Sequence, residues 1–271
     1  MEKSIMKESV EDMHEFLLRM VEDSAAHART HFRTTTAFSE KIPRQLVTEA
    51  DTDIETRIRE KIAQRFPDHG IVGEEFDAKK TNAEYVWMID PIDGTTNFIH
   101  KIPFFNTAVG LMKDGKFVLG AVAFPMLEMT FHAMRGQGAY LNDKPIDLAT
   151  VRPLEKSFIA FCHGSDPENT KRITEAYPTF KQATLDFRKL GSAALEVCYV
   201  AAGFICGFVA YKIKPHDFKP ACFIAQEAGC IVTDLAGNDW QAPGVDSVIV
   251  ARGESLHAEL LEKARQTSLI Q

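Results

Sequence analysis

The chain has 271 residues, of which 45% are hydrophobic and 25% are charged. This length and this balance are typical of one large globular module with a sizeable core. The formal net charge of -7 and the pI of about 5.7 argue against a broad nucleic-acid-binding face, which is normally basic. They do not exclude a phosphate substrate, because bound cations can reverse the local field.

Cysteine usage and the first residues point to a cytoplasmic protein. The cysteines are odd in number and form no C-x-x-C pair, so free thiols that pack as small apolar side chains are expected. They are Cys162, Cys198, Cys206, Cys222 and Cys230. Residues 1–10 are charged and lack the apolar core of a signal peptide, and no stretch has the length of an uncharged membrane span.

Two helices are predicted in the first quarter of the chain. Apolar residues recur at helical spacing through residues 13–21 and again, every four residues, within residues 52–66. Thr52 and Glu55 have the spacing of a capping box at the start of the second helix. The sequence Pro-Asp-His-Gly at residues 67–70 is expected to end it.

Short apolar runs after this point predict strands. Two of them flank Asp114-Gly115, which is a strong hairpin signal. A stretch rich in glycine and asparagine at residues 136–144 then turns the chain. The strands are predicted over residues 71–72, 85–89, 107–112, 116–124 and 129–133.

The second half alternates strands with helices. Strands are predicted over residues 157–161, 207–213, 230–233 and 247–251. Helices are predicted over residues 192–202, 218–228 and 254–266. Because both element types mix throughout, layered α/β structure is expected. A weak boundary near Thr150, where Arg152-Pro153 breaks the pattern, divides one module into lobes of residues 1–150 and 151–271.

The most informative segment is WMIDPIDGTTN, residues 87–97. An apolar strand ends in Asp90, a tight turn follows, and Asp93 comes three positions later. Mg²⁺ takes oxygen ligands in octahedral geometry, and two aspartates on one turn can serve two neighbouring ions. The N–H groups after Gly94, where two threonines open a short helix, suit a phosphate. An isolated pair of aspartates at this spacing is more often a cap and a turn.

Three further carboxylates stand at the ends of predicted elements. Glu74 follows a strand within Gly73-Glu74-Glu75, where a solvated loop is an equal explanation. Asp51 and Asp217 each precede a predicted helix, where an N-cap is the ordinary role of an aspartate. Taken one at a time, these residues leave a metal site undecided.

Taken together, these motifs resemble the inositol monophosphatase family of magnesium-dependent, lithium-sensitive phosphatases. The resemblance follows nearly the whole chain in order and spacing, and DPIDGT is its most specific motif. The matching segments are LVTEAD (46–51), GEE (73–75), DPIDGTTN (90–97), GQGAYLN (136–142), GSAAL (191–195) and QEAG (226–229) in the helix after Asp217. The resemblance implies a layered α-β-α-β-α sandwich. It also implies Mg²⁺-dependent hydrolysis of a small phosphate monoester by metal-activated water.

The resemblance assigns ligands to the metal ions. One Mg²⁺ would be held by Glu74, Asp90 and the backbone carbonyl of Ile92. A second would be held by Asp90, Asp93 and Asp217. Glu74 would also share a third, loosely held ion, and so counts among the catalytic residues. Most of these ligands fall in the N-terminal lobe, and Asp217 comes from the C-terminal lobe.

The resemblance also assigns the residues around the phosphate ester. Thr95 and Asp51 would orient the attacking water. The N–H groups of Gly94 and Thr95 would contact phosphate oxygens, with Asp93 beside them. The alcohol part of the substrate would lie near Gly191, Ser192 and Ala193. No covalent nucleophile is required, because phosphoryl transfer depends mainly on positioning and charge neutralisation.

The region that would contact the alcohol departs from the family pattern. The sequence GFIC, ending at Cys206, stands where family members often have G-R-x-D. Ala210 takes the position of a glutamate that holds inositol hydroxyls, so a hydrogen-bonding partner of the alcohol is lost. His216 replaces a tryptophan and Lys219 a small residue. Either could meet an anionic group, or they could be a packed histidine and a solvated lysine.

Several functions follow from the resemblance. Inositol monophosphate is the default substrate, and histidinol phosphate is an alternative because PDHGIVGEE (67–75) resembles the enzymes that hydrolyse it. Fructose 1,6-bisphosphate and adenosine 3′,5′-bisphosphate are further options. A different class of function is a protein partner in RNA processing or transcription antitermination, since the acidic balance disfavours only direct RNA contact. The resemblance further implies a homodimer.

Overall fold

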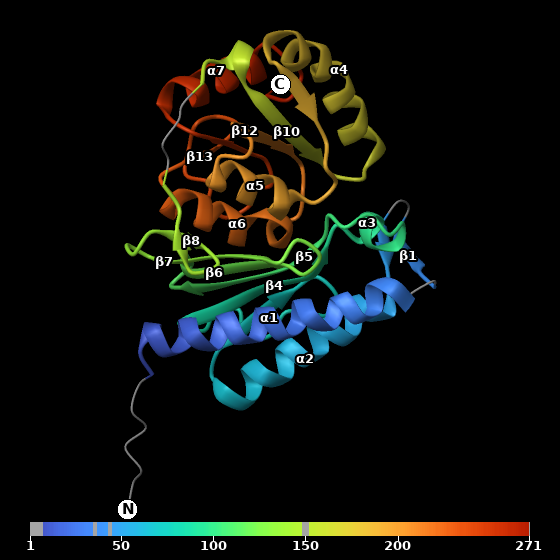
Figure 1. Cartoon of the computed structure of the whole chain (residues 1–271), viewed down its shortest axis with the longest axis vertical. Coiled ribbons are helices and arrows are strands. Elements are labelled where there is room, and N and C mark those ends of the chain that lie inside the picture. Colours follow the sequence, from blue (N-terminus) through green and yellow to red (C-terminus); the bar gives the residue numbers. More distant parts are fainter. Residues whose placement is uncertain (1–7, 35–36, 43–44, 148–151, 271) are drawn as a thin grey trace, which may run out of the picture.

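The computed structural model describes residues 8–34, 37–42, 45–147 and 152–270. Its elements form five alternating layers of helices and sheets (Figure 1), which confirms the predicted α-β-α-β-α sandwich. The first layer contains α1 (Val10–Thr34) and α2 (Glu49–Arg65), the middle layer α5 (Ala193–Ala202) and α6 (Pro215–Glu227), and the last layer α4 (Pro167–Ala183) and α7 (Glu254–Arg265). None of the helices in the described ranges has both the length and the apolar character of a membrane span.

A seven-stranded sheet separates the first helical layer from the middle one. Its strands follow chain order: β3 (Gly70–Gly73), β4 (Tyr85–Asp93), β5 (Asn106–Lys113), β6 (Lys116–Phe124), β7 (Met129–Met134), β8 (Ala139–Leu141) and β9 (Lys144–Pro145). Only the β3–β4 pair is parallel, and the other pairs are antiparallel. Asp114-Gly115 forms the tight β5–β6 turn with positive φ at both residues, as the hairpin signal predicts.

A five-stranded sheet lies between the middle and last helical layers. Its order is β11 (Asp186–Arg188), β10 (Phe158–His163), β12 (Gly207–Tyr211), β14 (Val248–Ala251) and β13 (Ile231–Asp234). The pairs of β10 with β11 and β12 are parallel, whereas those of β14 are antiparallel. Three short elements complete the fold: the hairpin of β1 (Ser39–Ile42) and β2 (Gln45–Val47), the helix α3 (Thr95–Ile99) and the 3-10 turn η1 (Leu154–Lys156).

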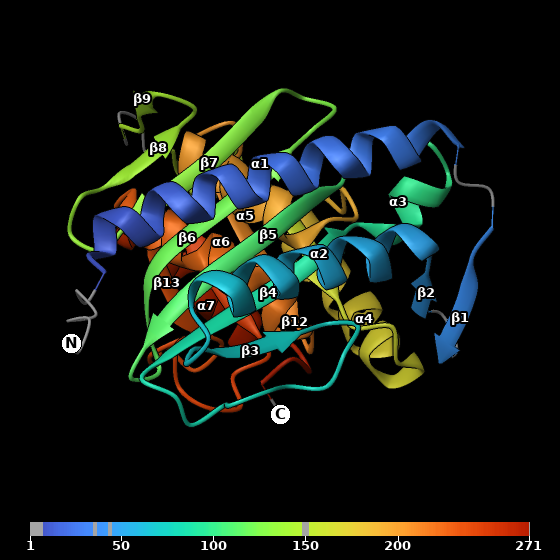
Figure 2. The same cartoon turned by 90° about the horizontal axis from the view of Figure 1, so that it is seen from below.

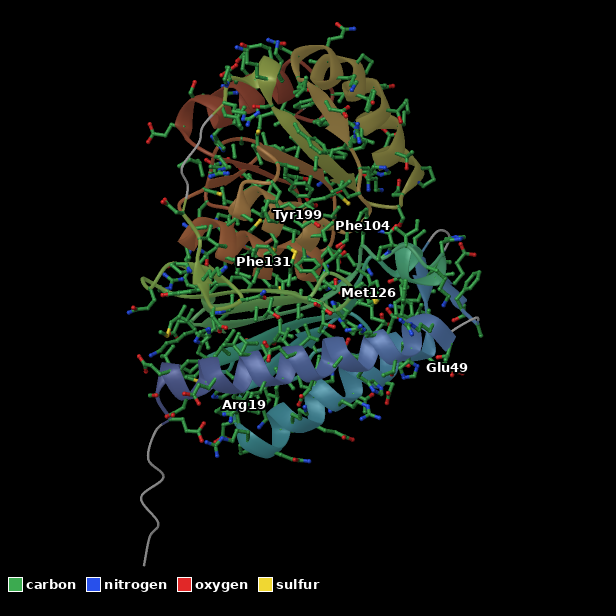
Figure 3. The ribbon with its side chains drawn as sticks, in the orientation of Figure 1. Arg19, Glu49, Phe104, Met126, Phe131 and Tyr199 are labelled. Atoms are coloured by element: carbon green, nitrogen blue, oxygen red, sulfur yellow. The ribbon has the colours of Figure 1, made fainter. Side chains whose placement is uncertain are left out.

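Apolar cores join the layers. The first lies between the seven-stranded sheet and α1 and α2, which run side by side across it (Figure 2). The central core surrounds α5 and α6, with Phe131 of the sheet buried in it and Tyr199 of α5 packed against it; Figure 3 labels both residues. Cys198, Cys222 and Cys230 are buried in this core, as the prediction of small apolar packing requires. The third core lies between the five-stranded sheet and α4 and α7.

The start of α2 differs from the prediction. The helix begins at Glu49, and Thr48 precedes it as the N-cap. Asp51 Oδ2 accepts hydrogen bonds from the N–H of Thr48 at 2.7 Å and from its hydroxyl at 2.5 Å. The predicted box of Thr52 and Glu55 is therefore wrong, and Asp51 lies inside the first turn.

The start of α6 also differs. It begins at Pro215, a residue that suits the first helical position because that position needs no N–H donor. Asp217 consequently lies in the first turn, where the positive end of the helix dipole favours a carboxylate. The helix α4 and the strand β11 were not predicted. The boundary predicted near Thr150 lies outside the described residues.

Candidate metal centre and active site

Asp90 and Asp93 lie at the end of β4, whose nine residues are all buried. The pairing of β4 with β5 shifts between these two aspartates, and such a bulge re-aims side chains at the end of a strand. Asp90 is 1% exposed and Asp93 is 8% exposed. In the described part of the chain, Asp90 Oδ1 is buried without a hydrogen-bond partner. A buried charge without a partner is costly, so a cation is expected at this atom.

Asp93 joins the two halves of the molecule. Its Oδ2 accepts hydrogen bonds from the Ser192 hydroxyl at 2.6 Å, the Asn106 side-chain amide at 3.0 Å and the Ala194 N–H at 2.8 Å. Ser192 is also the N-cap of α5, so one hydroxyl serves both the helix and the carboxylate. Burial and repulsion from Asp217 raise the pKa of Asp93 to about 7, although the hydrogen bonds oppose this rise.

Glu74 follows β3 and lies among cations. Its Oε1 is 3.0 Å from Lys214 Nζ, 3.7 Å from Lys41 Nζ and 3.9 Å from His216 Nε2. Burial alone would raise the pKa of Glu74, but the cations outweigh it and the pKa is lowered. His216 Nε2 also lies 3.1 Å from Asp217 Oδ1. Atoms of Glu74, His216 and Asp217 gather within 4.8 Å of one another, which is a spacing that a metal ion could bridge.

Asp51 and Thr95 lie on the side of the site formed by α2 and α3. The Thr95 hydroxyl is 3.5 Å from Asp51 Oδ1 and donates a hydrogen bond to the Ile92 carbonyl at 3.1 Å. Asp51 is fully buried, and burial raises its pKa to about 7 despite the hydrogen bonds from Thr48. A carboxyl group that titrates near neutral pH is suited to accepting a proton passed along by a hydroxyl.

A cavity of about 520 Å³ opens beside these carboxylates. Glu74, Thr95 and Asp217 line it, and so do two residues of the predicted phosphate and alcohol contacts, Gly94 and Gly191. Gly94 has φ 92, and a side chain there would approach the Phe104 carbonyl to 2.8 Å. Glycine therefore lets the backbone turn sharply next to the cavity.

The other predicted site residues lie behind this lining. Asp51, Asp90 and Asp93 are buried next to it. Ser192 and Ala193 are buried too, at 1% and 3% exposure, and their polar groups are directed at Asp93. These two residues therefore position a carboxylate, and an alcohol lying near them would meet mainly the Gly191 backbone.

Several residues of the cavity were missed by the sequence reasoning. Residues 162–167, from the end of β10 to the start of α4, form much of its lining, together with Lys212 and Lys214. Lys41 reaches Glu75 and Glu74 from the β1–β2 hairpin. Lys212 has φ 53, a left-handed conformation that is uncommon for lysine and frequent at functional sites. The signal in the sequence that could have revealed these cavity residues was the pair of lysines, Lys212 and Lys214, shortly before Asp217.

Three residues that depart from the family pattern lie in different surroundings. His216 is buried beside Glu74 and Asp217, and these carboxylates raise its pKa although burial alone would lower it. Lys219 is 7% exposed, so the expectation of a solvated lysine is wrong, and its Nζ lies 3.4 Å from the Ala242 carbonyl. Ala210 is buried in the central core.

The group of buried carboxylates favours a bound cation. Burial and repulsion from Glu74 and Asp93 raise the pKa of Asp90 well above its ordinary value. The carboxylates and the Ile92 carbonyl offer oxygen donors, which Mg²⁺ prefers. A divalent ion there would give Asp90 Oδ1 a partner and offset the repulsion. The residues present therefore fit Mg²⁺.

The chain is similar to known proteins over most of its length. The model of the inositol monophosphatase family matches residues 9–269. A fructose-1,6-bisphosphatase/inositol-1-monophosphatase of Aquifex aeolicus is 35% identical over 231 residues, 84% of each chain. The Nus factor SuhB of Escherichia coli is 36% identical over 202 residues, 73% of this chain and 75% of the relative.

Solved structures give the same result. The IMPase of Thermotoga maritima superposes with a TM-score of 0.86 and 29% identity, over 94% of this chain and 97% of the other. The extragenic suppressor protein suhB of Bartonella henselae superposes with a TM-score of 0.88 and 27% identity, over 94% and 99% of the two chains. The chain belongs to the inositol monophosphatase family.

Proposed function

We propose that the protein hydrolyses a small phosphate monoester with Mg²⁺ bound at the carboxylate site. One observation carries this proposal: Asp90 Oδ1 is buried and unpartnered in a group of carboxylates beside the cavity. Glu74, Asp90, Asp93, Asp217 and the Ile92 carbonyl would hold the metal. When bound, Mg²⁺ supplies charge neutralisation and lowers the pKa of water.

The chain's own groups have separate tasks in this reaction. The Thr95 hydroxyl and Asp51 would orient the attacking water and take its proton, because Asp51 titrates near neutral pH. Backbone N–H groups at Gly94 and Thr95 would hold phosphate oxygens at the start of α3. The Ser192 hydroxyl would keep Asp93 in place.

The alcohol part of the substrate is proposed to carry a second anionic group. Lys212 and Lys214 line the cavity, and their ammonium groups lie 3.0 Å from Asp246 and 3.0 Å from Glu74, carboxylates with which an incoming anion would share them. Ala210 stands where the family pattern has a glutamate that holds neutral hydroxyls, and it is buried in the central core. Cations attract an anion strongly in such a recess. A sugar or nucleotide bisphosphate therefore fits better than inositol monophosphate or histidinol phosphate. The name of the Aquifex aeolicus relative contains both a sugar bisphosphate and inositol 1-monophosphate, so it allows either class.

Lys212→Asn is expected to raise KM for fructose 1,6-bisphosphate or adenosine 3′,5′-bisphosphate about tenfold, which equals about 1.4 kcal/mol. It should change KM for inositol 1-phosphate much less, because only the bisphosphates would use the ammonium. Asparagine tolerates the left-handed φ of this position. The measurement is a phosphate-release panel with Mg²⁺.

Lys80→Asn is the matched control, since Lys80 has φ 47 and hydrogen-bonds to Pro67, on another part of the surface. The second-anion proposal would be contradicted if Lys212→Asn raised KM equally for all substrates, or if it did not raise KM for the bisphosphates. Release of phosphate from no ester by the wild type would contradict the hydrolase proposal itself.

A role as a protein partner is a second candidate, favoured by relatives named Nus factor SuhB. Such a role would use the outer surface, and the net charge of -7 favours a protein contact over an RNA contact. In a pull-down with transcription factors, Asp90→Asn is expected to bind as the wild type does, because Asp90 is buried. Failure of the wild type to retain any such factor would contradict the role.

Three properties stay predictions: two are implied by the family, and the third, the location, by cysteine usage and the first residues. A homodimer is checked by sedimentation at micromolar concentration, where a monomer would count against it. Inhibition by lithium is checked in the phosphate-release assay at millimolar lithium, where unchanged activity would count against it. A cytoplasmic location is checked by cell fractionation, where recovery outside the cytoplasm would count against it.

A further inference from the structure

A second group of metal-binding side chains lies on the outer helical layer. His27 and His31 stand one turn apart on α1, and Asp53 faces them from α2, which runs beside α1 (Figure 2). Their side chains are 25%, 32% and 40% exposed, respectively. The cavity of the candidate active site is lined by other residues, so this cluster is separate from it.

The distances in this cluster suit a tetrahedral ion. His27 Nε2 lies 2.5 Å from Asp53 Oδ2 and 3.2 Å from His31 Nε2, and His31 Nε2 lies 4.0 Å from Asp53 Oδ2. Two ligand atoms bound to Zn²⁺ at about 2.0 Å and at a tetrahedral angle are about 3.3 Å apart. The three observed distances bracket this value, so small side-chain rotations would complete the geometry.

Hydrogen bonds alone do not give each of these two nitrogens and the oxygen its own donor or acceptor. A neutral histidine carries at most one proton on Nε2, and His27 Nε2 would have to share it between Asp53 and His31. A cation in the middle would instead attract all three lone pairs at once. Arg57 Nε donates to Asp53 Oδ2 at 3.0 Å and so orients this carboxylate from its own helix.

We propose that His27, His31 and Asp53 bind a transition-metal ion such as Zn²⁺, which would clamp α1 to α2. Two imidazoles and one carboxylate select this class of ion over Mg²⁺, which prefers oxygen donors. The i, i+4 spacing of the histidines places both rings on one face of α1. A groove of about 430 Å³ between the helices, lined by His27 and Arg57, gives ions a route from solvent.

The test is Zn²⁺ binding by the full chain in excess Mg²⁺, measured by competition with a chromophoric chelator, with thermal unfolding as a second readout. We expect His31→Gln and Asp53→Asn to weaken Zn²⁺ binding at least about tenfold and to abolish the Zn²⁺-induced rise in Tm. His100→Gln, which removes an exposed histidine at the end of α3, is the matched control and should bind as the wild type does.

The variant His216→Gln distinguishes Zn²⁺ binding at this cluster from Zn²⁺ binding at the active site, where His216 lies beside carboxylates. Zn²⁺ binding that survives in His216→Gln and fails in His31→Gln supports the clamp. Binding that fails in His216→Gln and survives in His31→Gln would overturn it, as would wild-type protein that binds no Zn²⁺. Circular dichroism shows whether each variant is folded. If His31→Gln does not fold, Asp53→Asn tests the same site independently.

Discussion

Replacing Asp90 with asparagine is expected to lower kcat/KM about a thousandfold or more while leaving the metal-free fold at least as stable as the wild type. The loss of activity follows because Asp90 is the carboxylate shared by both proposed ion positions, and removal of one preorganised charged group typically costs this much. Asparagine keeps the volume of the side chain, so the buried end of β4 can stay packed.

The effect of Asp90→Asn on stability comes from the metal-free charge balance. Asp90 Oδ1 has no partner among the described residues, and burial together with nearby carboxylates raises its pKa well above the ordinary value. A neutral amide relieves that repulsion in the absence of metal. Thermal unfolding in EDTA should therefore give a Tm at or above that of the wild type.

Mg²⁺ provides the contrast in the same experiment. It should raise the Tm of the wild type, because an ion that binds only the folded state stabilises it, and it should do so much less for Asp90→Asn. Asp143→Asn, an exposed change near β9, is the control for losing one negative charge. Activity within about tenfold of the wild type, with an equal Mg²⁺-induced rise in Tm, would contradict the assignment.

The free energy of unfolding of the metal-free protein is expected to fall as the pH rises from about 4 to about 7. Asp51 and Asp93 each have a pKa raised to about 7 in the folded protein, chiefly by burial. In the unfolded chain an aspartate has a pKa of about 3.9. Between these values the folded state binds more protons than the unfolded state, so a rise in pH favours unfolding.

Urea unfolding at about pH 5.5 and about pH 7.5, in EDTA, measures this dependence. Histidines such as His14, whose pKa is lowered to about 4 by burial and by His132, act in the opposite direction. The informative quantity is therefore the difference between the wild type and Asp51→Asn, which should show a weaker fall. Saturating Mg²⁺ should also weaken the fall, because a bound cation keeps the carboxylates ionised. Equal pH dependence in all three conditions would contradict the burial of these charges around a metal site.

The candidate metal-site carboxylates could be singled out from the sequence because the family resemblance covers them and each stands near one end of a regular element. The apolar run before Asp90 produces a buried strand, and the DPIDGT motif fixes the turn that follows it. The layer order could likewise be predicted, because the family resemblance extends over both halves of the chain. Local periodicity alone would not have decided which sheet each strand joins.

The helix starts and the cations could not be predicted, because they depend on contacts made in the folded chain. The start of α2 is decided by the Asp51 carboxylate bonding back to Thr48. Lys214 meets Glu74 across 140 positions of sequence. The burial of Lys219 depends on α6 lying between two sheets, and no pattern on the helix itself shows this.

The most direct measurement is phosphate release by the full chain after its metal is removed with EDTA and after Mg²⁺ is added back, with an inositol monophosphate and a sugar bisphosphate as substrates. We expect no release in EDTA, a saturable return of release with Mg²⁺, and no such return in Asp90→Asn. Release that persists in EDTA, or Mg²⁺-dependent release that is the same in Asp90→Asn and wild type, would contradict a magnesium-dependent phosphatase centre built on these carboxylates.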